Sequence, residues 1–433
     1  MKSPDTPAEV PRSFVQYLRS MGPGIVVALT WLGAGDMVDS AVAGGHYGYS
    51  LMWAMVIALF VRFAFVSIIA KYQLCNQHGE SVMAGLRRLH PWLPWFVGLI
   101  GLVFVHFYGS YMVKGTGEAS ARLLGFMPAG AWSVFWVCMA AVFLYRGAYR
   151  HVEMVFYAFL VMLSVSLLGV AVWSGPDPVA AVKGALLFDL PEQTGQFSAL
   201  LVILSLIGAV GGSISNLLYP YFMQQKGWHG PKFRRLQTYD LAFGTLILVV
   251  LNLSVWTIGA EVLNPRGITL KDIDDLANLL TIALGALGGP IFYLGVFAAL
   301  YSSVIGSATG YGLLCVDVVS VSRPSNPLPA RRGLVSQLSI YRLVVAWGLF
   351  SPLIWSLPGM PGFVFLTVVA NAGTVIVLPV LSGSLWYITA RKRYIGETWR
   401  NKAWENGLMG GLFVLSLWGA YQSAIAIWAA ISG

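Results

Sequence analysis

Long apolar runs separated by short polar stretches dominate this chain of 433 residues. Eleven runs reach about 20 residues, the length that an α-helix needs to cross the hydrocarbon core of a bilayer. We place them near 22–48, 51–75, 94–114, 129–146, 152–173, 197–224, 238–260, 279–320, 338–356, 362–388 and 408–431. The eighth run is too long for one span, so we expect its helix to continue into the cytoplasm. The pattern predicts an all-α polytopic membrane protein with eleven transmembrane helices.

Two of these runs are interrupted by glycine near their middle. The first run contains Gly-Ala-Gly-Asp from Gly33 to Asp36, and the sixth contains a small, polar segment from Gly208 to Asn216. Backbone in lipid must satisfy its own hydrogen bonds, so a break at mid-membrane is tolerated only beside a cavity or inside protein. Paired breaks in corresponding halves point to a transporter's substrate site.

The spacing of the two breaks predicts an inverted repeat. Five spans separate the start of one broken helix from the start of the other, and an odd number inverts the second unit relative to the first. We therefore divide the chain into a cytoplasmic N-terminal segment (1–21), a first five-helix repeat (22–196), a second (197–390), and a cytoplasmic link with helix 11 (391–433).

Composition and charge agree with a membrane protein. The chain is 57% hydrophobic and only 10% charged, with a net charge of +9. Twenty of its 27 basic residues fall in alternate loops on one side and five on the other. This asymmetry predicts a cytoplasmic N-terminus and an external C-terminus. We interpret the positive charge as a topology signal, with no nucleic acid as partner.

Asp36 places an acid at membrane depth, where a carboxylate is expensive and is by default a functional-site candidate. With carbonyl groups freed near Gly33 it would offer hard oxygen ligands, which suit Mg²⁺, Ca²⁺ or Mn²⁺. Asp39 lies three residues on and shares its face if the helix resumes there. The alternative is that Asp36 caps the second half-helix. We favour the ion site, because a cap does not need mid-membrane placement.

The sixth run gathers five small or polar residues in six positions, namely Gly211, Gly212, Ser213, Ser215 and Asn216. Their hydroxyl, amide and freed carbonyl oxygens are candidate ligands for a cation, directly or through water. The alternative is that small residues let two helices approach closely. We interpret the cluster as the second half of the site, with Asn216 as its leading side chain.

Other chemistry is sparse. The sequence has no Walker, HExxH or GxSxG motif, so we expect neither an enzyme nor a cofactor. We interpret Cys75, Cys138 and Cys315 as small buried hydrophobes. His106 is expected to make a hydrogen-bonded helix contact, and Arg62 to snorkel or to pair within the bundle.

Four motifs resemble the Nramp divalent-metal transporters. Residues 22–24 read GPG, as at the start of that family's first helix, and residues 32–36 (LGAGD) stand where the family has L-D-P-G-N. Residues 208–210 (GAV) open the sixth helix as in the family, and residues 302–310 resemble its eighth-helix SS-x-x-G region. The resemblance implies a LeuT-like 5+5 inverted repeat with broken helices 1 and 6.

The departures from the family pattern bear on the transported ion. Gly33 stands at the family's metal-binding Asp and Asp36 at its Asn, and no Met or His occurs between Gly211 and Tyr221. A soft thioether favours Mn²⁺ or Fe²⁺ over Mg²⁺, so its loss removes a filter against hard ions. The pattern resembles the divergent prokaryotic branch of Nramp-related magnesium transporters, which implies Mg²⁺ and Mn²⁺ transport without proton coupling.

We therefore predict a bacterial inner-membrane importer of Mg²⁺, and also Mn²⁺, that works by alternating access. The ions are its substrates and the bilayer its surroundings, and no obligatory protein partner is evident. Candidate ligands are Asp36, Gly33, Gly211, Gly212, Ser213, Asn216 and Asp39. The alternatives are a proton-coupled Mn²⁺/Fe²⁺ transporter, a small organic-solute carrier of the same fold, and a membrane-embedded enzyme or channel.

Overall fold

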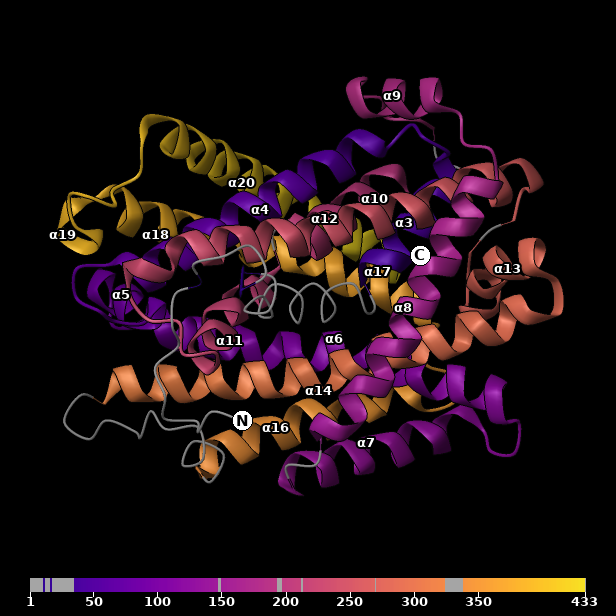
Figure 1. Ribbon diagram of the computed structural model, residues 1–433, viewed down its shortest axis with the longest axis horizontal. Coiled ribbons are helices and arrows are strands. Elements are labelled where there is room, and N and C mark those ends of the chain that lie inside the picture. The colour runs from indigo at the N-terminus through magenta and orange to yellow at the C-terminus, as the bar shows by residue number, and fades with distance from the viewer. Residues whose placement is uncertain are drawn as a thin grey trace.

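A computed structural model describes residues 11, 16–17, 35–146, 149–192, 197–211, 213–268, 270–323 and 338–432. Within these ranges the regular elements are all helical and form one bundle (Figure 1). The first half of the chain contains α3 (Met37–Tyr47), α4 (Met52–Cys75), α5 (Val82–Leu89), α6 (Leu93–Leu124), α7 (Ala129–Arg146), α8 (Tyr149–Trp173) and α9 (Pro178–Leu186).

The second half begins with a helix in pieces, α10 (Ala199–Leu206), the π-helical turn η2 (Ile207–Gly211), the 3₁₀ turn η3 (Ile214–Leu218) and α11 (Tyr219–Gln225). It continues through η4 (Pro231–Phe233), α12 (Arg234–Ile258), η5 (Gly259–Leu263), η6 (Asn264–Arg266), α13 (Ile273–Leu284), η7 (Gly285–Leu287), α14 (Gly288–Ser322), α16 (Ser339–Phe350) and η8 (Ser351–Ser356). The last elements are α17 (Phe363–Thr374), η9 (Val375–Val377), α18 (Leu378–Ala390), α19 (Lys392–Ile395) and α20 (Ala403–Ser432).

The helices match the predicted apolar runs, and the expected all-α polytopic fold is confirmed. Among the described residues, seven helices are long and apolar enough to cross a membrane, or eight if the bent pair α8–α9 counts as one span. The other predicted spans include the first, whose N-terminal part lies outside the described residues, and the shorter α7 and α16.

The expectation for the eighth run was wrong at its start. A turn divides this run at Gly285, whose φ of 61° lies in the left-handed region that glycine tolerates. Chain reversal makes α13 a separate helix beside the first turn of α14, where Gly288 closely approaches the backbone of Leu280. The apolar composition is continuous across the turn, so hydropathy alone does not locate it.

Two loops contain short helices, and one cysteine departs from its prediction. The polar loops contain α5 and α9, which begin at N-caps provided by Ser81 and Asp177. Cys75 and Cys315 are buried as expected, but Cys138 is exposed on α7, so that part of the interpretation was wrong.

Close packing between helices organises the bundle. The third and eighth spans, α6 and α14, lie along one another, and α3 packs against α12 and η5 (Figure 1). Glycine permits the second contact: a Cβ atom on Gly44 would lie 2.4 Å from the carbonyl oxygen of Trp256, and one on Gly259 would lie 2.9 Å from the Gly45 nitrogen. These contacts hold α3 in the centre of the molecule.

Candidate functional site at the two broken helices

The sixth span breaks where its sequence changes from large aliphatic residues to glycine and serine. α10 begins at the N-cap Ser198 and runs through largely buried aliphatic residues to Leu206. The π-turn η2 follows, and the chain resumes at Ser213, whose hydroxyl oxygen accepts a hydrogen bond from the Ser215 N–H and caps η3. The predicted break in helix 6 is confirmed.

The described part of the first span begins at Gly35, which with Asp36 forms a π-helical turn that leads into α3 at Met37. Asp36 occupies the N-cap position of α3, but its side chain accepts no hydrogen bond from the helix N-terminus. The capping alternative for Asp36 is therefore contradicted. Ser40 donates instead to the Asp36 carbonyl at 2.7 Å and to the amide oxygen of Asn252 on α12 at 3.0 Å.

The Asp36 carboxylate is paired with Arg62 of α4. Arg62 Nη1 donates to Asp36 Oδ2 at 2.7 Å and Nη2 lies 3.3 Å from Oδ1, so the pair is bidentate. Arg62 Nη2 also donates to the carbonyl oxygen of Ala209 in η2. Asp36 is 1% exposed and Arg62 is fully buried. One guanidinium thus joins the two broken helices.

Asp39 lies one turn further along α3 and is held by neutral donors. Ser205 Oγ donates to Asp39 Oδ1 at 2.7 Å, and Asn371 Nδ2 donates to Oδ2 at 2.9 Å. Ser205 belongs to α10 and Asn371 to α17, so this acid links three helices. Its position confirms that α3 resumes before Asp39, as the prediction required.

Two glycines at the breaks lie against Asn371. A Cβ on Gly35 would fall 2.7 Å from Asn371 Nδ2, and one on Gly208 would fall 2.0 Å from the Asn371 carbonyl oxygen. The glycines therefore permit α17 to approach both broken helices, in addition to weakening the helix there.

Hydroxyl groups line the adjoining part of the sixth span. Tyr108 of α6 shares a 2.8 Å hydrogen bond with Ser213 Oγ, and Tyr311 of α14 shares a 3.1 Å bond with Ser215 Oγ. Asn216 is fully buried in η3, and its N–H donates to the Ser213 carbonyl at 3.0 Å. This wall offers oxygen atoms without a further charge.

The predicted ligands thus lie on two segments of the chain. Asp36 and Asp39 lie on α3, and Ser213 and Asn216 lie on η3 with Gly211 at the end of η2. Gly33 and Gly212 lie outside the described residues. Within the described chain, no group of three or more His, Cys, Asp or Glu side chains comes together to hold a metal ion. A metal at this site would take its remaining ligands from carbonyls, hydroxyls, amides or water.

Arg62 is the residue that the sequence interpretation underestimated. Pairing within the bundle was one of its two expected roles and is confirmed. Its partner was not foreseen, because helix spacing does not relate residues 26 positions apart on different helices. One signal was available: a single arginine inside an apolar run requires a counter-charge, and Asp36 and Asp39 are the neighbouring acids.

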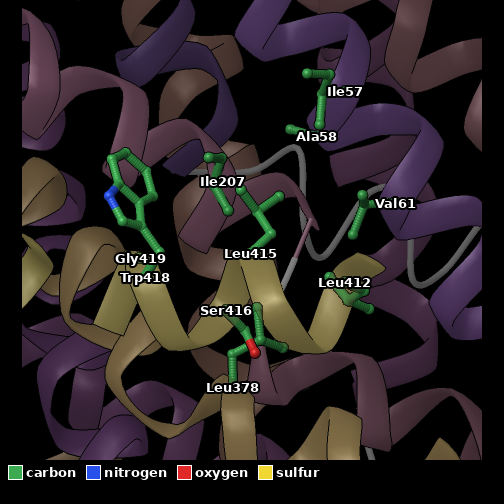
Figure 2. Close-up of a pocket in the computed structure, with 10 residues that line it drawn as sticks. All are labelled: Ile57, Ala58, Val61, Ile207, Leu378, Leu412, Leu415, Ser416, Trp418 and Gly419. Atoms are coloured by element: carbon green, nitrogen blue, oxygen red, sulfur yellow. The ribbon is translucent and has the colours of Figure 1, made fainter. Parts of the chain in front are cut away.

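Neighbouring polar and apolar features have other roles. His106 shares a 2.9 Å hydrogen bond with Ser351 Oγ and accepts one of 2.9 Å from Trp355, which confirms the expected helix contact. The cavity in Figure 2 lies between α4, η2 and α20 and is lined by side chains such as Val61, Ile207 and Leu415. Because Ser416 is its main polar side chain, this cavity is unsuited to an ion.

A polytopic bundle whose helices break beside buried charges defines a membrane transporter fold. Residues 24–426 match the family described as natural resistance-associated macrophage protein-like, or Nramp. The chain belongs to this family, as its first- and sixth-helix motifs predicted.

Relatives and solved structures agree. The chain is 24% identical to the divalent metal cation transporter MntH of Chromohalobacter salexigens over 70% of this chain and 71% of that protein. It is 21% identical to the MntH of Bacillus subtilis over 69% and 71%. A crystal structure of the Eremococcus coleocola manganese transporter superposes with a TM-score of 0.74, at 18% identity, over 98% of this chain and 90% of that one. The expected LeuT-like fold is confirmed.

Proposed function

We propose that this protein transports divalent metal cations, Mg²⁺ and Mn²⁺ among them, across a bacterial inner membrane by alternating access. The observation that carries the proposal is the meeting of two broken helices at Asp36, within a chain of the Nramp family. The MntH relatives, which are divalent metal cation transporters by name, support the class of substrate.

The oxygen-containing groups beside the two broken helices support the transport of hard cations. Carboxylate, hydroxyl, amide and carbonyl oxygens are the groups on η3 and α3, and the sequence from Gly211 to Tyr221 lacks methionine and histidine. Mg²⁺ binds oxygen and keeps several of its waters, whereas a thioether or imidazole favours softer transition metals. We therefore expect Mg²⁺ to enter this carrier with part of its hydration shell.

Uptake does not require protons in this proposal. An inside-negative potential contributes about 4.6 kcal/mol per 100 mV for a divalent cation, twice the value for one charge. The basic loops are placed inside, with the N-terminus cytoplasmic and the C-terminus external. The ion then enters down its own electrochemical gradient.

The test is uptake of Mg²⁺ and Mn²⁺ into proteoliposomes that contain a pH dye, comparing the native chain with Asp36→Asn. We expect saturable entry of both ions without acidification, and its loss in the variant. Glu405→Gln is the matched control. Glu405 is a buried acid on α20, outside the broken helices, and its carboxylate accepts a 2.6 Å hydrogen bond from Lys71. Mn²⁺ entry with acidification and without Mg²⁺ would instead identify a proton-coupled transporter.

The ion pair itself favours a second candidate, a carrier of small zwitterions. A buried carboxylate beside a buried guanidinium is complementary to an ammonium and a carboxylate on one molecule. Inhibition of metal uptake by millimolar amino acids, or amino acid flux in the absence of metal, would support this candidate. No divalent flux together with amino acid flux would replace the metal proposal.

A further inference from the structure

We propose that Arg62 is a tethered cation of the carrier, which competes with the transported metal for Asp36 and neutralises Asp36 when the metal leaves. This inference rests on the proposed metal transport and names the residue that takes the place of a coupling proton. Arg62 lies on α4, and none of the metal ligands predicted from the sequence belongs to that helix.

The geometry places the guanidinium where the two breaks converge. Arg62 contacts the Asp36 carboxylate on one broken helix and the Ala209 carbonyl on the other, with both nitrogen atoms of its fork engaged. A metal that uses Asp36 together with the carbonyl groups of η2 needs these same oxygen atoms. Metal and guanidinium therefore exclude one another, and binding requires Arg62 to withdraw.

Neutralisation follows from burial. Asp36 is 1% exposed, and an unpaired carboxylate at that depth carries a desolvation penalty of several kcal/mol. A carrier must reorient after the metal leaves, so something must compensate this charge. Arginine stays protonated at any physiological pH, so the Arg62 guanidinium compensates this charge without the binding of a proton.

Asp39, the neighbouring acid on α3, is not the salt-bridge partner of Arg62 in the structure. Both carboxylate oxygens of Asp39 accept hydrogen bonds from the neutral donors Ser205 and Asn371, whereas the salt bridge of Arg62 is made to Asp36. Withdrawal of Arg62 would therefore expose Asp36 and leave the bonds of Asp39 in place.

The experiment compares native protein with Arg62→Gln in proteoliposomes, with Mn²⁺ as the probe ion. Three quantities are measured: the KM for Mn²⁺, net uptake into metal-free vesicles, and exchange of labelled Mn²⁺ against internal Mn²⁺. We expect the KM to fall by about tenfold as the competitor is lost. Net uptake should fall at least as far, while exchange persists, because only net uptake requires reorientation of the metal-free carrier.

Lys71→Gln is the matched control. Lys71 lies on α4, nine residues after Arg62, and is likewise buried and paired with an acid, Glu405. This control should leave the ratio of exchange to net uptake unchanged. Arg62→Lys keeps the charge but not the forked contact, so it should lower the KM by a smaller factor and retain net uptake. This variant serves if Arg62→Gln does not fold.

Each result is decisive. If Arg62→Gln shows the native rate of net uptake, the native KM and the native ratio of exchange to net uptake, the inference is overturned. The proposed function would still stand in that case. If Arg62→Gln does not fold, a native KM in Arg62→Lys would do the same. A native chain that moves no divalent metal would overturn the proposed function, and the competition with it.

Discussion

At the scale of single residues, the main feature of this protein is a buried carboxylate, Asp36, whose charge is balanced by Arg62. Asp36 alone would be an acid in the middle of a membrane bundle, yet Arg62 gives it two hydrogen bonds and an opposite charge. Breaking such a pair by removing one partner is strongly destabilising, whereas removing both is often nearly neutral. The stability and the function of Asp36 are therefore coupled.

This coupling predicts the stability of three variants. Asp36→Asn leaves the Arg62 charge buried without its counter-charge and should lower the free energy of unfolding by about 3 kcal/mol or more. Arg62→Gln should have a similar effect, because the Asp36 carboxylate remains. The double variant should recover most of the loss. Thermal unfolding in detergent measures all three, and additive losses in the double variant would contradict the pairing.

At the scale of helices, Asn371 joins the two breaks through α17. Its carbonyl oxygen lies against Gly208, its side chain passes Gly35, and its amide donates to Asp39. A movement of α17 would therefore change the contacts that Asn371 makes with both broken helices. Close approach of backbone is what glycine allows and alanine forbids at these positions.

The contact predicts opposite behaviour of two glycines. Gly208→Ala would place Cβ 2.0 Å from the backbone oxygen of Asn371, which cannot rotate away, so α17 must shift. We expect a loss of thermal stability and of transport. Gly411→Ala on α20 has no atom within 4 Å of the new Cβ, so stability should be unchanged or slightly raised. Equal effects at both sites would refute this account of Gly208.

At the scale of the whole molecule, the proposed function requires one buried site to face either side of the membrane in turn. α3 packs against α12 and η5, η2 packs against α4 and α17, and α6 and α14 lie along one another (Figure 1). The proposed carrier moves two positive charges for each metal ion, so the membrane potential acts directly on its transport.

The proposed uniport predicts how far the ion accumulates. With a potassium diffusion potential of about −60 mV, Mn²⁺ should approach an inside-to-outside ratio of about 100, since each charge contributes about 2.3 kcal/mol per 100 mV. Measuring internal Mn²⁺ at several potentials checks the slope. Accumulation that follows a pH gradient at zero potential would indicate proton coupling instead.

The charge asymmetry of the loops predicts which residues a reagent can reach. In a chain without native cysteines, Asp189→Cys lies in an exposed loop expected outside, and His78→Cys lies in an exposed loop expected inside. A membrane-impermeant maleimide applied to intact cells should label the first and spare the second. The reverse pattern would invert the orientation.

Local sequence determined the elements of this protein. Apolar runs longer than a bilayer core define helices such as α4 and α6, and glycine with serine ends regular helix at η2, because these properties act within a few residues. Hydropathy did not reveal the turn at Gly285, since the residues on either side are equally apolar.

Contacts between distant residues were decided only by the tertiary structure. The sequence shows an acid in one run and an arginine in another, but the folded bundle sets Arg62 between Asp36 and Ala209, and Asn371 between Gly35 and Gly208. These neighbours follow from how helices pack against one another, and side-chain spacing along one helix carries no information about that packing. Candidate residues such as Asp36 could therefore be named from the sequence, while the pairing of Asp36 with Arg62 could not.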